Sequence, residues 1–144
     1  MKSEPARLNL LLAEDNLPDA LLVKEAIRIE GLALDVHHVS DGKRAMDFIA
    51  KAEEDPTAPW PHLMLLDLNL PKVEGIEVLR WLRSGGKRTQ IPVIVITSSD
   101  SPKDRADSAS LGATYFRKPI SYDEFLKIGP ALREFLKNMG AAGT

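Results

Sequence analysis

The chain contains no cysteine, which excludes both a disulfide framework and a thiolate metal site. Its net charge is only -2 and no dense basic run is present, so nothing favours binding to nucleic acid. No apolar stretch approaches membrane-spanning length, and the start, Met1 to Pro5, lacks the apolar core of a signal peptide. These absences predict a cytoplasmic domain of bacterial type, without a DNA-binding module and without a membrane partner.

The length of 144 residues is close to the commonest size of a single domain and leaves room for a real hydrophobic core. We expect one folded domain at residues 8–138, between flexible tails at 1–7 and 139–144. No internal repeat or low-complexity segment interrupts it. The sequence therefore predicts that no output module shares this chain.

Strand and helix patterns alternate five times along the chain. The runs Leu8–Ala13, Leu63–Leu66 and Pro92–Ile96 are almost wholly apolar, as in strands that are buried on both faces. Asp35–Val39 is more polar and is predicted at an edge, and Ala113–Phe116 supplies the fifth strand. This alternation predicts an α/β fold with a five-stranded parallel sheet.

Amphipathic helices are predicted after each of the first three strands, the second and third of them at Lys43–Ala52 and Ile76–Arg83. The fourth helix opens at Ser101 and is short and mostly polar, so we expect it to pack weakly and to move. The last helix opens at Ser121 with a capping-box pattern. It contains Pro130 on its polar side, where we expect a kink rather than a break.

Acidic side chains follow two of the buried strands: Glu14 and Asp15 follow the first, and Asp67 follows the third. The carboxyl ends of parallel strands meet at one edge of a sheet, and clustered carboxylates usually hold a hard cation. We therefore expect Mg²⁺, with Asp15 and Asp67 as direct ligands, Glu14 acting through a water, and the Asn69 backbone carbonyl as a further ligand. Each acidic group on its own also fits a solvated loop or a turn cap.

Asp67 can also serve as a nucleophile, because carboxylates form acyl-phosphates when a metal bridges the carboxylate and the phosphoryl oxygen. Lys118 offers a positive charge and Thr97 a hydroxyl to the same phosphoryl group, while Tyr115 could swing between exposed and buried rotamers. Each has a plainer interpretation: a surface lysine, a β-branched residue that favours a strand, and an aromatic residue at a sheet edge.

Taken in order, these residues resemble the receiver domain of two-component response regulators. The matching motifs are Glu14-Asp15, Asp67-Leu68-Asn69-Leu70-Pro71, Thr97-Ser98, Tyr115 and Lys118-Pro119. The resemblance spans roughly residues 8–138 and implies a (βα)5 flavodoxin-like fold with helices on both faces of the sheet. It implies that a sensor histidine kinase phosphorylates Asp67, that Mg²⁺ (with Mn²⁺ as a substitute) is the cofactor, and that Lys118 contacts the phosphate. Thr97 and Tyr115 would relay the change to a surface made by the fourth helix, the last strand and the last helix.

A narrower resemblance is to stand-alone receivers that serve phytochrome-type kinases. It rests on Glu14-Asp15-Asn16, on the loop from Asp67 to Pro71, and on the proline-rich insertion at residues 53–61. Self-association into a homodimer is a further expectation, because Tyr122, Phe125 and the segment Phe135–Met139 could extend an apolar face. The same residues would equally serve to cover the sheet.

Two other functions fit parts of the pattern. Aspartate-nucleophile phosphatases usually carry a second Asp two residues after the nucleophile, where this chain has Asn69, and they need more chain for a cap. A phosphorylation-independent, receiver-like binding module would normally have lost Asp67, Lys118 or the acidic pair. We therefore expect a phosphoacceptor that catalyses only its own phosphorylation and dephosphorylation, rather than an enzyme with a separate substrate.

Overall fold

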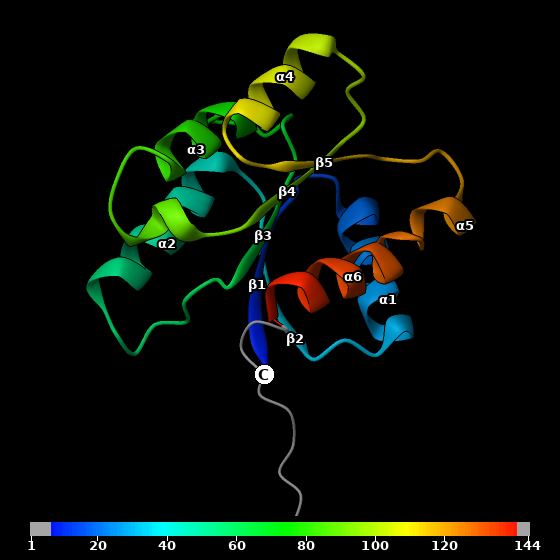
Figure 1. Ribbon diagram of the computed structural model, residues 1–144, viewed down its shortest axis with the longest axis horizontal. Coiled ribbons are helices and arrows are strands. Elements are labelled where there is room, and N and C mark those ends of the chain that lie inside the picture. The colour runs from blue at the N-terminus through cyan, green and yellow to red at the C-terminus, as the bar shows by residue number, and fades with distance from the viewer. Residues whose placement is uncertain (1–6, 141–144) are drawn as a thin grey trace, which may run out of the picture.

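The computed structural model describes residues 7–140. Five parallel strands form one sheet in the order β2-β1-β3-β4-β5, with helices on both faces (Figure 1). This confirms the predicted fold class. The strands are β1 (Leu8–Ala13), β2 (Leu34–Val39), β3 (Leu63–Leu66), β4 (Val93–Thr97) and β5 (Thr114–Arg117). Within residues 7–140, no helix combines the length and apolar character needed to cross a membrane.

The helices lie close to their predicted positions. They are α1 (Leu17–Glu30), α2 (Gly42–Glu54), α3 (Gly75–Leu82), α4 (Pro102–Ser110), α5 (Tyr122–Phe125) and α6 (Ile128–Gly140), with a short 3-10 helix, η1 (Lys87–Gln90), before β4. The two tails predicted at 1–7 and 139–144 lie mostly outside the part of the chain that the structure describes. Arg7 is the first residue that the structure describes, and its Nε donates a hydrogen bond to Asp35 Oδ1 of β2 at 2.6 Å.

Alternating residues of the strands point into two separate cores, because successive side chains of a strand face opposite sides of a sheet. Leu10 and Leu12 of β1 pack in the layer that α1 and α6 cover, whereas Leu11 and Ala13 pack in the layer that α2 and α3 cover. Figure 1 shows these two helical layers on opposite sides of the sheet. Burial on both faces explains why β1, β3 and β4 are almost wholly apolar.

The last helix is broken rather than kinked, so that prediction was wrong. α5 ends at Phe125 and α6 begins at Ile128, which places Pro130 in the first turn of α6. The N–H groups of a first turn have no partner within the helix, so a proline there loses no hydrogen bond. Phe125, Ile128 and Leu132 are all buried in the core under α1, whereas Tyr122 is exposed. Phe125 thus covers the sheet and does not extend an outer apolar face.

α4 packs against the rest of the fold mainly through polar contacts, with few apolar side chains buried beneath it. Ser108 is the single buried residue of this helix, and its hydroxyl has no hydrogen-bond partner. At the end of the helix, Arg83 Nε donates to the Leu111 carbonyl oxygen at 2.7 Å, while its Nη1 donates to the Ile91 carbonyl oxygen at 2.8 Å. This weak apolar packing is what the polar sequence of α4 predicts; the movement expected of α4 stays a prediction.

Candidate functional site

Three carboxylates gather at the carboxyl end of the sheet. Glu14 follows β1 and Asp67 follows β3, and because these strands pair with Ala13 opposite Leu66, the two acids emerge side by side. Glu14, Asp15 and Asp67 each offer an oxygen atom within 4.8 Å of the others. Glu14 and Asp67 are buried and Asp15 is exposed. The structure therefore brings the three predicted acids together, two inside the fold and one at its surface.

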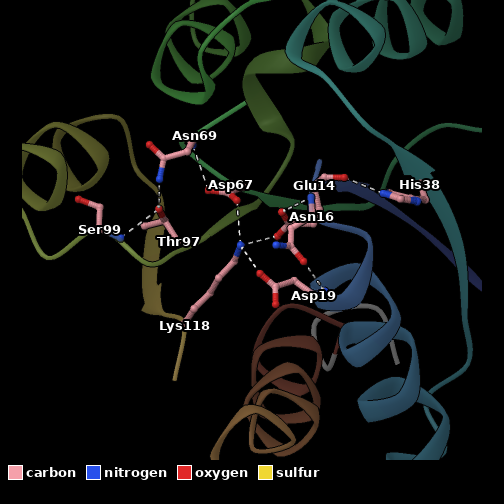
Figure 2. Close-up of polar contacts among 9 residues, drawn as sticks. All are labelled: Glu14, Asn16, Asp19, His38, Asp67, Asn69, Thr97, Ser99 and Lys118. Carbon is pink, nitrogen blue, oxygen red and sulfur yellow. Dashed lines mark hydrogen bonds and ion pairs between the residues drawn. The ribbon is translucent and has the colours of Figure 1, made fainter. Parts of the chain in front are cut away.

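Lys118 lies between Glu14, Asp67 and Asp19 (Figure 2). Its Nζ is 2.7 Å from Glu14 Oε1 and 2.9 Å from Asp67 Oδ2, and the side chain is only 10% exposed. The Lys118 backbone N–H donates to the Thr97 carbonyl oxygen at 2.8 Å. This hydrogen bond extends the pairing of β4 with β5 by one residue and fixes the Lys118 backbone beside the site. A third carboxylate oxygen, Asp19 Oδ2 in the first turn of α1, lies 2.9 Å from the same nitrogen.

The electrostatics of the cluster shift two pKa values. Burial raises the pKa of Glu14 to about 7 and the Asp67 charge adds to this, although the contact with Lys118 opposes both. For Lys118, burial alone would lower the pKa, but contacts with Glu14, Asp67 and Asp19 outweigh burial and leave the pKa raised. The lysine is therefore a fixed positive charge at neutral pH, while the charge on Glu14 is costly.

The raised pKa of Glu14 predicts a pH dependence of stability in the presence of a chelator. From its ordinary value of 4.5 to about 7, the folded chain holds a proton that the unfolded chain has released. The free energy of unfolding should therefore fall as pH rises through this window, by about 2 kcal/mol. Urea unfolding at pH 5 and pH 7.5 measures the effect, and Glu14→Gln should abolish it. A Glu14→Gln variant with the wild-type pH profile would contradict this assignment.

The donor set fits a hard divalent cation. Glu14 Oε1 is buried and faces the Lys118 ammonium ion at 2.7 Å, with no other donor within hydrogen-bond distance in residues 7–140. Asp67 Oδ1 accepts one hydrogen bond, from the Asn69 backbone N–H at 3.0 Å, which leaves further lone pairs available. Carboxylate oxygens are the ligands that Mg²⁺ and Mn²⁺ prefer, and like charges this close favour an added cation. The Asn69 carbonyl as a ligand stays a prediction.

Thr97 connects this cluster to the loop before α4. Its side chain is buried, and its Oγ1 accepts from the Ser99 backbone N–H at 3.3 Å and lies 3.5 Å from Asn69 Nδ2. Tyr115 lies outside the cluster: its hydroxyl donates to the Ser99 carbonyl oxygen at 2.5 Å, and the Arg105 guanidinium lies 4.5 Å from its ring centroid. Ser99 is thus the shared partner of Thr97 and Tyr115, which are the two residues expected to relay a switch.

Backbone contacts hold Glu14 in place. Its Oε2 accepts from the Asn16 backbone N–H at 3.0 Å, and its carbonyl oxygen lies 2.7 Å from His38 Nε2 on β2. Asn16 in turn caps α1, because its Oδ1 accepts from the Asp19 backbone N–H at 3.0 Å. One short turn therefore fixes both the buried acid and the start of α1.

The loop after Asp67 is held by a close approach of backbone to backbone at Gly75. Its N–H donates to the Leu68 carbonyl oxygen at 3.0 Å. A Cβ atom at Gly75 would overlap the Asp67 carbonyl oxygen and lie 2.6 Å from the Leu68 Cα. Only glycine allows α3 to begin this close to the residue that the site is built around.

Asp19 and Ser99 are contacting residues that sequence reasoning missed, as is His38, which lies against the Glu14 carbonyl oxygen. Asp19 stands three residues after Asn16, a spacing that indicates a helix cap and nothing about a lysine 99 residues further along the chain. Ser99 follows Thr97-Ser98 in a polar loop, and its role as a shared partner depends on where Tyr115 lies. Neither contact has a local sequence signal.

Comparison with known proteins gives a consistent result. A family model described as "Response regulator receiver domain" matches residues 10–128. Among curated relatives, the response regulator Rcp1 of Synechocystis sp. PCC 6803 is 33% identical over 135 residues, which cover 93% of this chain and 91% of that protein. A probable methanogenesis regulatory protein, FilR2 of Methanothrix harundinacea, is 34% identical over 128 residues, covering 88% of this chain and 81% of its own.

Solved structures of response regulators are also similar to this chain. A phosphorylated cyanobacterial phytochrome response regulator, RcpA, superimposes with a TM-score of 0.82 at 34% identity, covering 90% of this chain and 94% of that one. A Mn²⁺-bound form of the response regulator Rcp1 gives a TM-score of 0.81 at 32% identity, covering 89% and 93%. The predicted resemblance to receivers of phytochrome systems is confirmed, because this chain is similar in sequence and structure to a cyanobacterial phytochrome response regulator.

Proposed function

Because this chain belongs to the response regulator receiver family, we propose that Asp67 accepts a phosphoryl group from the phosphohistidine of a sensor histidine kinase. The observation that carries the proposal is the convergence of Lys118, Glu14 and Asp15 on the Asp67 carboxylate at the carboxyl edge of the sheet. A buried carboxylate beside a fixed ammonium ion is suited to form an acyl-phosphate, because the incoming negative charge meets a partner.

Glu14, Asp15 and Asp67 would hold Mg²⁺, or Mn²⁺ in its place, with the Asn69 backbone carbonyl as a further ligand. When bound, the cation supplies charge neutralisation between the carboxylate and the phosphoryl oxygens. The convergence of the three carboxylates and the Mn²⁺-bound form of the related Rcp1 support a divalent cation at these residues.

The residues of the chain then act in sequence. A free lone pair of the Asp67 carboxylate attacks phosphorus in line, an O–P bond forms, and the P–N bond to the donor histidine breaks. Lys118 moves its ammonium group from the carboxylates to a phosphoryl oxygen, and Thr97 offers its hydroxyl to another. Thr97 Oγ1 accepts from the Ser99 N–H in this structure, so its turn toward the phosphoryl group releases that loop. The Tyr115 hydroxyl, which is bonded to the Ser99 carbonyl oxygen, is affected by the same movement.

The energy available suits a switch at the surface formed by α4, β5 and the two helices that replace the predicted last helix, α5 and α6. Moving a two-state equilibrium from 1:99 to 99:1 takes about 5.5 kcal/mol. Each new hydrogen bond to a charged group supplies about 1.5–3 kcal/mol, so two or three are needed, and Lys118, Thr97 and the metal site supply that number. α4, with Ser108 as its single buried residue, resists the movement least.

The kinase partner is proposed to be of phytochrome type, because the similar RcpA is a cyanobacterial phytochrome response regulator. The protein would then act in the cytoplasm, where such kinases present phosphohistidine. It would change only its own phosphorylation state. A homodimer is a further proposal, which rests on the exposed Tyr122 and on the segment Phe135–Met139, whose apolar side chains are half-buried.

Intact-mass measurement after incubation with acetyl phosphate tests the proposed function. The wild type in Mg²⁺ should gain one phosphoryl group, whereas Asp67→Asn, and the wild type in a chelator, should gain none. A folded, metal-bound wild type that gains nothing would favour a phosphorylation-independent binding module. An Asp67→Asn variant labelled like the wild type would show that another residue is the acceptor.

A further inference from the structure

Asp19 contacts the reacting cluster without belonging to the predicted metal site. Its Oδ2 lies 2.9 Å from Lys118 Nζ and accepts a hydrogen bond from it (Figure 2). The Asp19 side chain is 26% exposed, so it lies at the mouth of the site, whereas Glu14 and Asp67 lie inside it. The ammonium ion thus spans from the buried acids to a carboxylate at the surface.

Helix capping does not explain this side chain. In a capping box, the acid at the third helical position returns a bond to the backbone N–H of the cap residue. Here that N–H, on Asn16, donates to Glu14 Oε2 instead, at 3.0 Å. Asp19 serves the cap only through its backbone N–H, which donates to Asn16 Oδ1. Its carboxylate is therefore free of the cap and is directed to Lys118.

The three carboxylates around the ammonium ion have different fates in the reaction. Glu14 and Asp67 are the acids that would bind the cation, and Asp67 would also become the acyl-phosphate. Both contacts of Lys118 with buried acids are therefore weakened as the site is loaded, because the cation shares the negative charge of Glu14 and of Asp67 with the ammonium ion. The contact between Lys118 and Asp19 is unchanged when the cation binds, because Asp19 is not one of the three acids, Glu14, Asp15 and Asp67, that could hold the metal ion.

We propose, on the basis of the proposed function, that Asp19 is a positioning residue for Lys118. It retains the ammonium ion beside Asp67 while Glu14 and Asp67 bind a divalent cation, so that the ammonium ion is in place when a phosphoryl oxygen arrives. Without Asp19, Lys118 is left with contacts that loading weakens, and its long side chain moves toward solvent.

Chemical labelling of lysine tests this position directly. With saturating Mg²⁺ and no phosphoryl donor, acetylation by a lysine-selective ester is followed by peptide mass spectrometry. Asp19→Asn should raise the labelling of Lys118 by about fivefold, the size of one partly exposed charge pair. Labelling of Lys103, whose side chain is 77% exposed, should not change. Asp19→Glu should restore the wild-type rate, because a carboxylate can still reach the ammonium ion. Unchanged labelling of Lys118 in Asp19→Asn would overturn the proposal.

A double-mutant cycle separates positioning from a general effect of charge. With acetyl phosphate and Mg²⁺, Asp19→Asn should slow formation of the adduct by about fivefold, but should have no further effect in a Lys118→Met background. The control Asp123→Asn removes an exposed acid from the first turn of α5 and should leave the rate unchanged. Equal losses in both backgrounds would show that Asp19 does not act through Lys118. If the wild type forms no adduct, the proposed function fails, while the labelling result still decides the role of Asp19.

Discussion

Replacing Lys118 with methionine is expected to lower the free energy of unfolding by about 3 kcal/mol in the presence of a chelator. The ammonium group lies within 2.9 Å of three carboxylates, and two of these, Glu14 and Asp67, are buried. Removing it takes away a contact that lowers the pKa of Glu14, so Glu14 must either keep its charge beside Asp67 or hold a proton at neutral pH, and either costs more than losing a surface ion pair. Methionine keeps most of the length of the side chain, so the loss reports charge rather than packing.

Urea unfolding with EDTA and with saturating Mg²⁺ measures this effect. A dication held by the same acids replaces the missing charge, so Mg²⁺ should restore most of the lost stability of Lys118→Met. Lys103→Met is the matched control, because Lys103 pairs with Asp107 on the exposed face of α4 and should change stability by less than about 0.5 kcal/mol. If Lys118→Met in EDTA unfolds at the wild-type midpoint, the ammonium group does not offset the buried acids.

Replacing Gly75 with alanine is expected to cost about 3 kcal/mol and to slow phosphorylation of Asp67. The added methyl group would overlap the Asp67 carbonyl oxygen and lie 2.6 Å from the Leu68 Cα, and neither is the end of a flexible side chain. The backbone after Asp67 must therefore shift or α3 must move away. Helix propensity favours alanine over glycine by about 1 kcal/mol, so any destabilisation isolates the overlap.

Gly31→Ala provides the contrast for this experiment. Gly31 ends α1 with a φ of 70° and has no atom within 4 Å of an added Cβ, so alanine there meets strain but no overlap. We expect a cost of about 1 kcal/mol and an unchanged rate of adduct formation. Thermal unfolding and intact mass, measured on both variants, separate the two effects. A Gly75→Ala protein as stable as the wild type would mean that the backbone after Asp67 can shift to accept the added methyl group at no cost in free energy.

The sheet and the acids at its edge could be predicted because the signals are local. Runs such as Leu63–Leu66 must be buried on both faces, and a parallel sheet then brings Glu14, Asp67 and Lys118 to one edge whatever the loops do. The position of Tyr115 could not be predicted in the same way, because its partner is a carbonyl oxygen in a separate loop. Strand patterns determine which residues meet, and loop geometry determines which atoms touch.

The break between α5 and α6 and the role of Asp19 had ambiguous signals. Pro130 fits a kink within one long helix as well as the first turn of a new one, and only the burial of Phe125 and Ile128 on the same core favours the second. The spacing of Asp19 from Asn16 fits the acid of a capping box, but in the structure its carboxylate accepts a hydrogen bond from Lys118 instead. Local preference was overridden where a buried charge needed a partner.

The order of the acids and the lysine along the chain has a consequence for biosynthesis. β1 and β3 pair directly, so Glu14 and Asp67 can meet as soon as the ribosome has released the first half of the chain. Lys118 emerges much later, after β4 and α4. A nascent chain that pairs its first strands early therefore carries two acids side by side with no ammonium partner. Until that lysine arrives, water, a proton or a dissolved cation must stabilise these acids.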